Sequence, residues 1–120
     1  FIPWSFQPNH TRLSEKPQNG VDYLRMVALS RLVLDNIEHV QAGWVTEGPY
    51  MAQLALTFGA DDFGGVLMEE SVVKATGIAH TVTAEEVIAL IAETGMTAAQ
   101  RNTDYEILQT FDRQRTLKSA

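Results

Sequence analysis

Residues 40–70, VQAGWVTEGPYMAQLALTFGADDFGGVLMEE, decide the fold that this sequence predicts. Two stretches, 40–45 and 62–68, have the length and composition of short apolar strands. A helical stretch lies between them, and a strand, a helix and a second strand within about thirty residues form a βαβ unit. We therefore expect the two strands to be parallel.

The predicted helix of this unit carries a start signal and a stop signal. Gly48 and Pro49 open it, because proline suits the first helical position, and Gly59 closes it, because glycine is favoured just past a helix end. Upstream, residues 1–6 are apolar and strand-like. Residues 21–34 have helical spacing and a wide apolar surface, as in a helix that neighbours cover. The order strand, helix, strand, helix, strand predicts the α/β class with a parallel sheet.

The rest of the chain is predicted to be helical. A short helix is expected over residues 69–76, and Thr83 with Glu86 makes a capping-box pattern before a helix that Gly95 ends. The tail has mixed polarity, and its apolar residues are expected to form one or two further helical turns: Tyr105, Ile107, Leu108 and Phe111. This reading gives βα units over residues 1–77 and a helical extension over residues 78–120.

Composition excludes several functions. The chain has 120 residues, a net charge of −6 and only nine Lys and Arg, so no basic face for nucleic acid is expected. No apolar run approaches the ~20 residues of a membrane-spanning helix. Cysteine is absent, which excludes disulfides and thiolate-bound metal within these residues. We expect a cytoplasmic protein, and the apolar start at Phe1 looks like a cut inside a larger fold.

Polar and aromatic residues follow the predicted strands, at the carboxyl ends where ligands bind in parallel α/β folds. Acidic residues surround the last strand, either to bind ribose hydroxyls or accept a proton, or as helix-cap and turn acids: Asp61, Asp62, Glu69 and Glu70. Gly64 and Gly65 mark a bulge or a close approach of a ligand to the backbone. Aromatic residues at the strand ends either stack on a ring or fill the core: Trp4, Phe6 and Trp44.

The three histidines have no spacing typical of metal ligands. His10 lies in the polar loop 7–20, which is a candidate lid or binding loop, or else a solvated excursion. His39 and His80 are interpreted as structural.

Three strings carry a resemblance to a known family: FIPWSFQP, QAGWVTEGP, and GADDFGG followed by MEE. Over residues 1–104 the chain resembles the C-terminal half of the radical SAM enzymes of the futalosine route to menaquinone, most of all the members that cyclise dehypoxanthine futalosine. The resemblance implies the last three βα units and C-terminal helices of a (β/α) barrel. It also implies S-adenosylmethionine and a 4Fe-4S cluster in the full-length parent. The family's CxxxCxxC motif is missing here, so this chain alone is expected to hold neither group and to be inactive.

The family chemistry implied is hydrogen abstraction from a ribose by a 5′-deoxyadenosyl radical, followed by ring closure. On this basis we predict three sets of site residues. The catalytic set is Asp62, Glu69 and Glu70. The cofactor-binding set is Trp4, Phe6 and Gln7. The substrate-binding set is Trp44, Thr46, Glu47, Gly64 and His10.

Three alternatives remain open. The chain resembles, less closely, the sibling synthase that joins S-adenosylmethionine to an enol ether and the deazaflavin-forming relatives. A non-catalytic binding module is the alternative from another class. Because three barrel strands leave both sheet edges unpaired, we expect the isolated chain to form a homo-oligomer.

Overall fold

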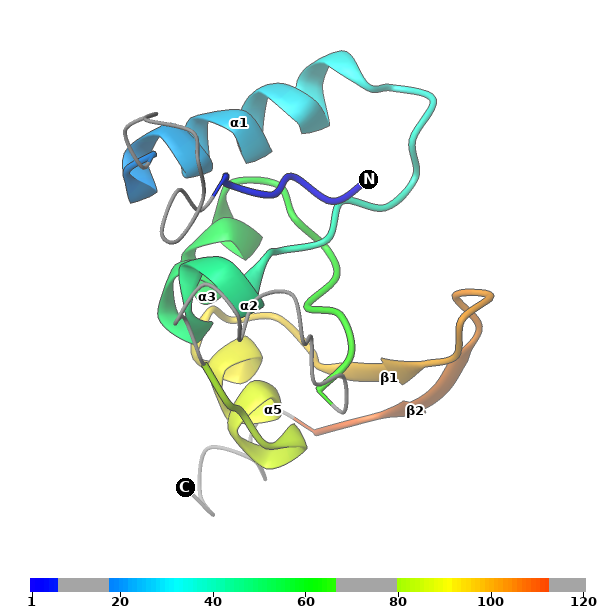
Figure 1. Cartoon of the computed structure of the whole chain (residues 1–120). Helices are drawn as coiled ribbons and strands as arrows, with labels where there is room; N and C mark the ends of the chain where they lie inside the picture. The colour runs from blue at the N-terminus through cyan, green and yellow to red at the C-terminus, as the bar shows by residue number, and fades with distance from the viewer. Residues whose placement is uncertain (7–17, 67–79, 113–120) are drawn as a thin grey trace. The chain divides into compact units, whose positions relative to one another are not determined.

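The computed structural model describes residues 1–6, 18–66 and 80–112 (Figure 1). The chain separates into two compact units, Phe1–Thr81 and Val82–Ala120. The first unit contains α1 (Gly20–Val33), α2 (Trp44–Glu47) and α3 (Pro49–Thr57), and the second contains α5 (Ala84–Glu93), β1 (Ala99–Arg101) and β2 (Ile107–Thr110). The helix predicted over residues 69–76 lies outside the described residues. Among those that are described, no helix is both long enough and apolar enough to cross a bilayer.

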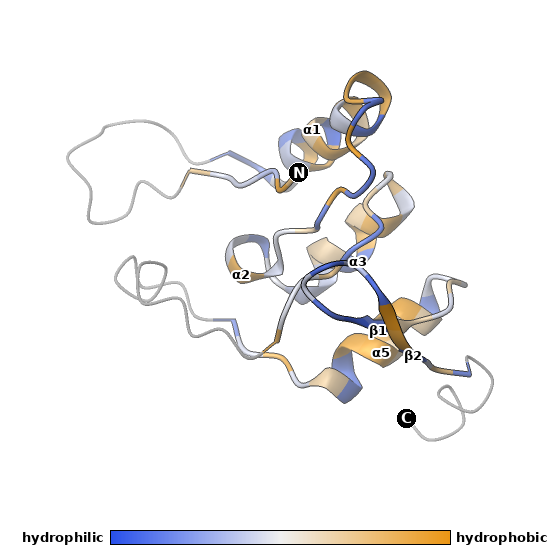
Figure 2. Cartoon of the chain, turned by 90° about the vertical axis from the view of Figure 1, so that its right-hand side faces the viewer, coloured by the Kyte–Doolittle hydropathy of each residue, from blue (hydrophilic) through white to orange (hydrophobic). Residues whose placement is uncertain are grey.

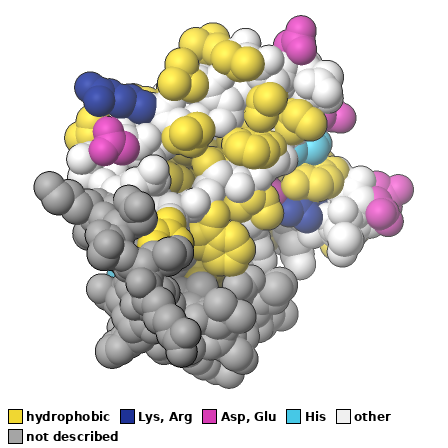
Figure 3. All heavy atoms as spheres, turned by 45° about the horizontal axis from the view of Figure 1, so that its top comes forward, with side chains coloured by type: hydrophobic (Ala, Val, Ile, Leu, Met, Phe, Trp, Pro, Cys, Tyr) yellow, Lys and Arg dark blue, Asp and Glu magenta, His cyan; other side chains and the backbone are white. Residues whose placement is uncertain are grey.

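Helix α1 forms where the sequence predicts it. The side chain of Asn19 caps its first turn by accepting from Asp22 N at 3.0 Å. Its buried face consists of Tyr23, Val27 and Ser30. The sequence predicts that neighbouring elements cover its wide apolar surface, but the described residues do not do so. Five large apolar side chains of the helix are exposed: Val21, Met26, Leu29, Leu32 and Val33. Figure 3 shows apolar side chains gathered on this face of the protein.

The parallel arrangement predicted for the βαβ unit is confirmed. Residues 41 and 62 form a parallel bridge, with Ala42 N donating to Asp62 O at 2.8 Å. The first residues join on the other side, because the amino group of Phe1 donates to His39 O and Gln41 N donates to Phe1 O. This is the bonding pattern of parallel strands. Segments 1–3, 40–42 and 61–63, here called the parallel segments, therefore lie side by side in that order.

The predicted strand lengths are wrong. The strand expected over residues 40–45 ends at Gly43, because Trp44 begins helix α2 and Glu47 N donates to Gly43 O at 3.0 Å. The strand expected over residues 62–68 is interrupted at Gly64, where φ is +80°. A side chain there would also collide with Gln41, whose Nε2 lies 2.5 Å from the position of an added Cβ. Residues 67 and 68 lie outside the described residues, and residues 1–6 form no assigned strand.

Helix α3 has the predicted ends. Pro49 occupies its first turn, and Gly59 follows its C-cap with φ of +111°, a conformation that glycine adopts without strain. The helix packs against α1 and α2. Faces of the three helices and the parallel segments contribute the buried core of this unit. Its apolar side chains are Tyr23, Val27, Val40, Ala42, Trp44, Ala52, Ala55, Leu56, Ala60 and Phe63.

The second unit combines one helix with a two-stranded sheet. The capping box predicted at α5 is present, with Glu86 N donating to Thr83 Oγ1 and Thr83 N donating to Glu86 Oε2. The helix ends at Glu93, shortly before Gly95 as predicted. Figure 2 shows it as largely hydrophobic, in agreement with the burial of Val87 and Ala92.

The helical turns predicted for the tail are wrong, because this part of the chain is a β-hairpin. Strand β1 pairs antiparallel with β2, with a register shift between Gln100 and Arg101. The side chain of Asn102 holds the turn by accepting from Asp104 N at 2.9 Å and from Glu106 N at 3.0 Å. The guanidinium of Arg101 lies 4.0 Å from the ring centroid of Tyr105. Ile107 and Leu108, predicted to lie in those helical turns, are exposed residues of β2.

Candidate functional site

Polar groups converge at the carboxyl end of the parallel segments, around Gly43. Gly43 N donates to the phenol oxygen of Tyr23 at 2.7 Å, in a buried hydrogen bond, and Thr46 Oγ1 donates to Gly43 O at 3.3 Å. A Cβ placed on Gly43 would lie 3.3 Å from Pro3 O and 3.5 Å from the phenol oxygen of Tyr23. Helix α1 and two of the parallel segments thus bring three elements to this point.

Two buried oxygens at this end have no hydrogen-bond partner in the described part of the chain. They are Ser5 Oγ and Glu47 Oε1. Ser5 lies two residues beyond Pro3 and is 6% exposed, and Glu47 ends helix α2. We call Ser5, Tyr23, Thr46 and Glu47 the polar cluster. Buried polar atoms in folded proteins are almost always hydrogen-bonded, so these two oxygens are exceptions among the described residues.

The Glu47 carboxylate affects the pKa of the Tyr23 phenol. Burial raises the pKa of the Tyr23 phenol above its ordinary value, and the charge of Glu47 raises it further, against the opposing hydrogen bond from Gly43 N. The phenol therefore keeps its proton at neutral pH. Its oxygen accepts from Gly43 N, and its O–H stays a hydrogen-bond donor.

The structure separates the predicted aromatic residues. Trp44 is 4% exposed and belongs to the core, whereas Trp4 and Phe6 are 52% and 41% exposed. Two of the predicted substrate-binding residues, Thr46 and Glu47, join the polar cluster.

Of the predicted catalytic carboxylates and loop residues, the structure describes Asp62 but not the others. Asp62 Oδ1 accepts from Gly64 N at 3.1 Å, so this carboxylate orders its own turn. The other predicted site residues lie outside the described residues: Gln7, His10, Glu69 and Glu70.

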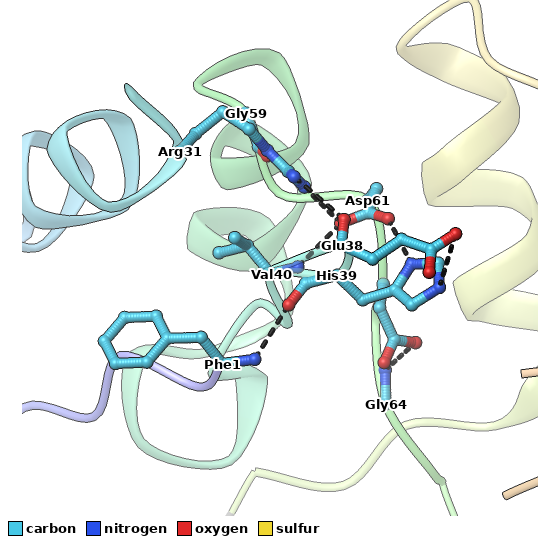
Figure 4. A network of polar contacts seen from close by, with 9 residues as sticks. Phe1, Arg31, Glu38, His39, Val40, Gly59, Asp61 and Gly64 are labelled. Carbon is cyan, nitrogen blue, oxygen red and sulfur yellow. Dashed lines mark hydrogen bonds and ion pairs between the residues drawn. The ribbon is translucent and has the colours of Figure 1, made fainter. Parts of the chain in front are cut away.

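Asp61 lies at the opposite, amino end of the parallel segments, in a network of structural bonds (Figure 4). Its Oδ1 accepts from Val40 N at 2.7 Å and pairs with the guanidinium of Arg31, while its Oδ2 lies 2.7 Å from His39 Nδ1. Arg31 also donates to Gly59 O and Glu38 O. His39 is therefore structural, as predicted, and Asp61 ties the first helix to the parallel segments.

The network predicts a stability change in acid. Burial opposes ionisation of Asp61, but the bonds from Val40 N and His39 and the charge of Arg31 outweigh it and lower the pKa of this carboxyl below 3.8. A carboxyl whose folded-state pKa is depressed contributes stability above its unfolded-state pKa, and this contribution is lost as the pH falls through the folded-state pKa. Urea titrations between pH 7 and pH values below 3.8 are expected to show a smaller acid loss in Asp61→Asn than in the wild type. Asp35→Asn, at an exposed turn, is the matched control, and an acid loss unchanged by Asp61→Asn would contradict the prediction.

Two residues of the polar cluster were not predicted. Tyr23 lies within an apolar helical stripe and was read as part of that helix. Ser5 lies between Trp4 and Phe6 in a strand-like segment, and no motif in the sequence marks it as a site residue. The signal for Ser5 is the alternation of burial, since Pro3 and Ser5 are buried while Trp4 and Phe6 are exposed.

The residues do not fit an iron–sulfur cluster. The sequence contains no cysteine, and the described residues contain no group of three metal-ligating side chains. Any such cluster in a longer protein must therefore take its thiolate ligands from residues outside this chain.

Comparison with known proteins identifies relatives along nearly the whole chain. A family model described as the CofH/MqnC C-terminal region matches residues 1–114. Cyclic dehypoxanthine futalosine synthase of Halalkalibacterium halodurans is 47% identical over 113 residues, which are 93% of this chain and 30% of that protein. The enzyme of the same name from Streptomyces coelicolor is 42% identical over 93% of the chain and 28% of its own length.

A third relative has a different name. The 5-amino-6-(D-ribitylamino)uracil–L-tyrosine 4-hydroxyphenyl transferase of Methanoculleus marisnigri is 38% identical over 90% of the chain and 31% of its own length. The chain thus spans less than a third of each of these three relatives.

Proposed function

Because the chain belongs to the family of CofH/MqnC C-terminal regions, we propose that it is the C-terminal part of a radical SAM enzyme that cyclises dehypoxanthine futalosine in menaquinone formation. The observation that carries this proposal is the 47% identity to a cyclic dehypoxanthine futalosine synthase along 93% of the chain. The 38% identity to the hydroxyphenyl transferase is lower over a similar share, so transfer of a hydroxyphenyl group is the second candidate.

The parallel segments would be strands of a (β/α) barrel in the longer protein. In that fold the active site lies at the carboxyl ends of the strands. This is the end that carries the polar cluster and the exposed rings of Trp4 and Phe6. It is also the end opposite to the Asp61 network, which therefore has a structural task.

The chain contributes positioning groups to the proposed reaction. S-adenosylmethionine, when bound, supplies the radical chemistry of this enzyme class. The exposed faces of Trp4 and Phe6 fit stacking against a purine or aryl ring. Glu47 and Thr46 hold the polar part of the substrate, and the predicted carboxylates Asp62, Glu69 and Glu70 stay candidates for accepting a proton. Self-association of the isolated chain through its unpaired edges also stays a prediction.

A direct assay tests the function. The purified protein that carries this chain, supplied under anaerobic conditions with reductant, S-adenosylmethionine and dehypoxanthine futalosine, is expected to form the cyclic product, detected by mass spectrometry. The control replaces the substrate by tyrosine and 5-amino-6-(D-ribitylamino)uracil. Turnover of this pair, with dehypoxanthine futalosine left intact, would overturn the proposal in favour of the transferase.

A further inference from the structure

We infer that the outward side of helices α1 and α3 is the contact surface for a second copy of this protein. This surface, here called the outer face, consists of five exposed apolar side chains: Val21, Leu32, Tyr50, Leu54 and Phe58. The inference goes beyond the proposed function, because it concerns assembly rather than catalysis.

Helix α1 is apolar on the side opposite to its buried face. Successive residues of a helix are ~100° apart, so Leu32 and Tyr23 point in nearly opposite directions. Tyr23 is 1% exposed, whereas Leu32 is 79% exposed. Val21 lies within about 20° of Leu32 around the helix axis and is 60% exposed. A surface helix normally carries polar residues on this side, so the pattern indicates a partner there.

Helix α3 repeats the pattern. Tyr50, Leu54 and Phe58 are spaced four residues apart, which places them along one side, and all three are exposed. Ala52, about 200° from Leu54 around the axis, has no exposed surface. The helix sequence PYMAQLALT contains no charged residue. A helix that is apolar on both sides is expected to be covered on both.

The outer sides of the two helices form one surface, because the helices lie side by side. Near their starts, Gly20 lies against the side chain of Met51, and near their ends Arg31 donates to Gly59 O at 2.7 Å. Both helices therefore run in the same direction. Figure 3 shows apolar side chains gathered on the side of the protein that carries α1. Apolar surface that extends over two neighbouring elements is typical of an interaction site.

The remainder of a longer protein would meet a different side of α1. The chain spans less than a third of each relative compared above. In the proposed barrel, the next helix lies beside α1 in the same layer and packs on its flank. Met26 and Val33 are exposed on the flank that faces away from α3. Leu32 lies opposite to the buried face, so only a partner stacked on the outside of the helix layer covers it.

Charge favours a second copy over a membrane as this partner. The chain has nine Lys and Arg against 15 Asp and Glu, whereas helices that lie on anionic membranes are rich in Lys and Arg. On the outward side of α1, Arg25 is paired with Asp22 of the same helix at 3.6 Å. Two identical outer faces can therefore meet about a two-fold axis without bringing unpaired like charges together.

Sedimentation velocity of the purified protein that carries this chain tests the inference. The wild type is expected to be a dimer that dissociates on dilution. Leu32→Glu is expected to raise the dimer dissociation constant at least about tenfold, because dimerisation would bury an unpaired carboxylate. Tyr50→Glu, in the first turn of α3, is expected to have the same effect. Both side chains are exposed, so the unfolding midpoint of the dilute monomer is expected to stay unchanged.

Leu108→Glu is the matched control. It makes the same chemical change at a position of β2 that is 60% exposed, and it is expected to leave the dissociation constant unchanged. A wild type that stays monomeric at every concentration would overturn the inference, as would a dimer that Leu32→Glu and Tyr50→Glu leave intact.

Two other results would assign the outer face to a different occupant and overturn the inference as well. One is binding of a monomeric wild type to phosphatidylglycerol-containing vesicles that Leu32→Glu abolishes, which indicates a membrane. The other is a lower unfolding midpoint of Leu32→Glu at an unchanged monomeric mass, which indicates cover by the same protein chain.

The outcomes for the inference and for the proposed function are distinguishable. If no cyclic product forms but dimerisation depends on Leu32 and Tyr50, the proposed function fails and the inference stands. If product forms and the protein is a monomer, the function stands and the inference fails.

Discussion

Replacing Arg31 by methionine is expected to lower the free energy of unfolding by about 2–3 kcal/mol, one of the two largest effects we predict. Its guanidinium donates to Gly59 O at 2.7 Å and to Glu38 O at 2.9 Å, and it pairs with the carboxylate of Asp61. Methionine keeps the apolar stem of the side chain, so the loss reports on these polar bonds rather than on packing. Urea titration at pH 7 measures it.

The matched control is Arg25→Met on the same helix. Arg25 is 72% exposed, and its ion pair with Asp22 at 3.6 Å is of the surface type, which contributes little. A change below about 0.5 kcal/mol is expected there. The combination Arg31→Met with Asp61→Asn is expected to cost less than the two single changes added together, because each removes the partner of the other. Equal effects of Arg25→Met and Arg31→Met would contradict the structural role of the network.

Local signals were sufficient to predict several elements of the fold. The Gly48-Pro49 pair and Gly59 bound α3 because proline and glycine act through their own backbone preferences, which need no tertiary context. The capping box of α5 is local for the same reason. The parallel bridge follows from the length of the chain between residues 41 and 62, which is enough for a helical crossover.

Other features depend on contacts that no local pattern contains. The strand was expected to continue past Gly43, but helix α2 begins there instead, and its Trp44 is buried in the core. The hairpin escaped prediction because Ile107 and Leu108 are adjacent and both exposed, so the strand lacks alternation. Asn102 is the one local signal for its turn, since asparagine side chains readily bond the backbone two residues on.

The candidate site also combines residues that the sequence predicts with a residue that only tertiary packing places there. Thr46 and Glu47 were predicted from their position after a strand, which is a rule about topology. Tyr23 reaches the site from α1, twenty residues earlier in the chain, through its bond with Gly43 N. Only the packing of that helix on the parallel segments brings the phenol there.

Trp44→Ala is expected to lower the free energy of unfolding by about 3–5 kcal/mol, the largest effect we predict. The sequence left open whether this ring stacks on a ligand or fills the core, and its exposure of 4% places it among the buried core residues. Removal of a buried indole loses its transfer free energy and leaves a cavity that the surrounding backbone fills only in part. The urea midpoint of the chain, compared with that of the wild type, measures the loss.

Trp4→Ala provides the control with the same chemical change. Trp4 is 52% exposed, so its removal is expected to cost less than about 1 kcal/mol in stability. If Trp4 stacks on a ring of the ligand, its variant loses affinity at nearly unchanged stability, whereas Trp44→Ala loses both. A Trp44→Ala chain as stable as Trp4→Ala would show that the indole of Trp44 is not a core group. The two tryptophans, equivalent in the sequence pattern, are thus expected to act on different quantities because one is buried and the other is not.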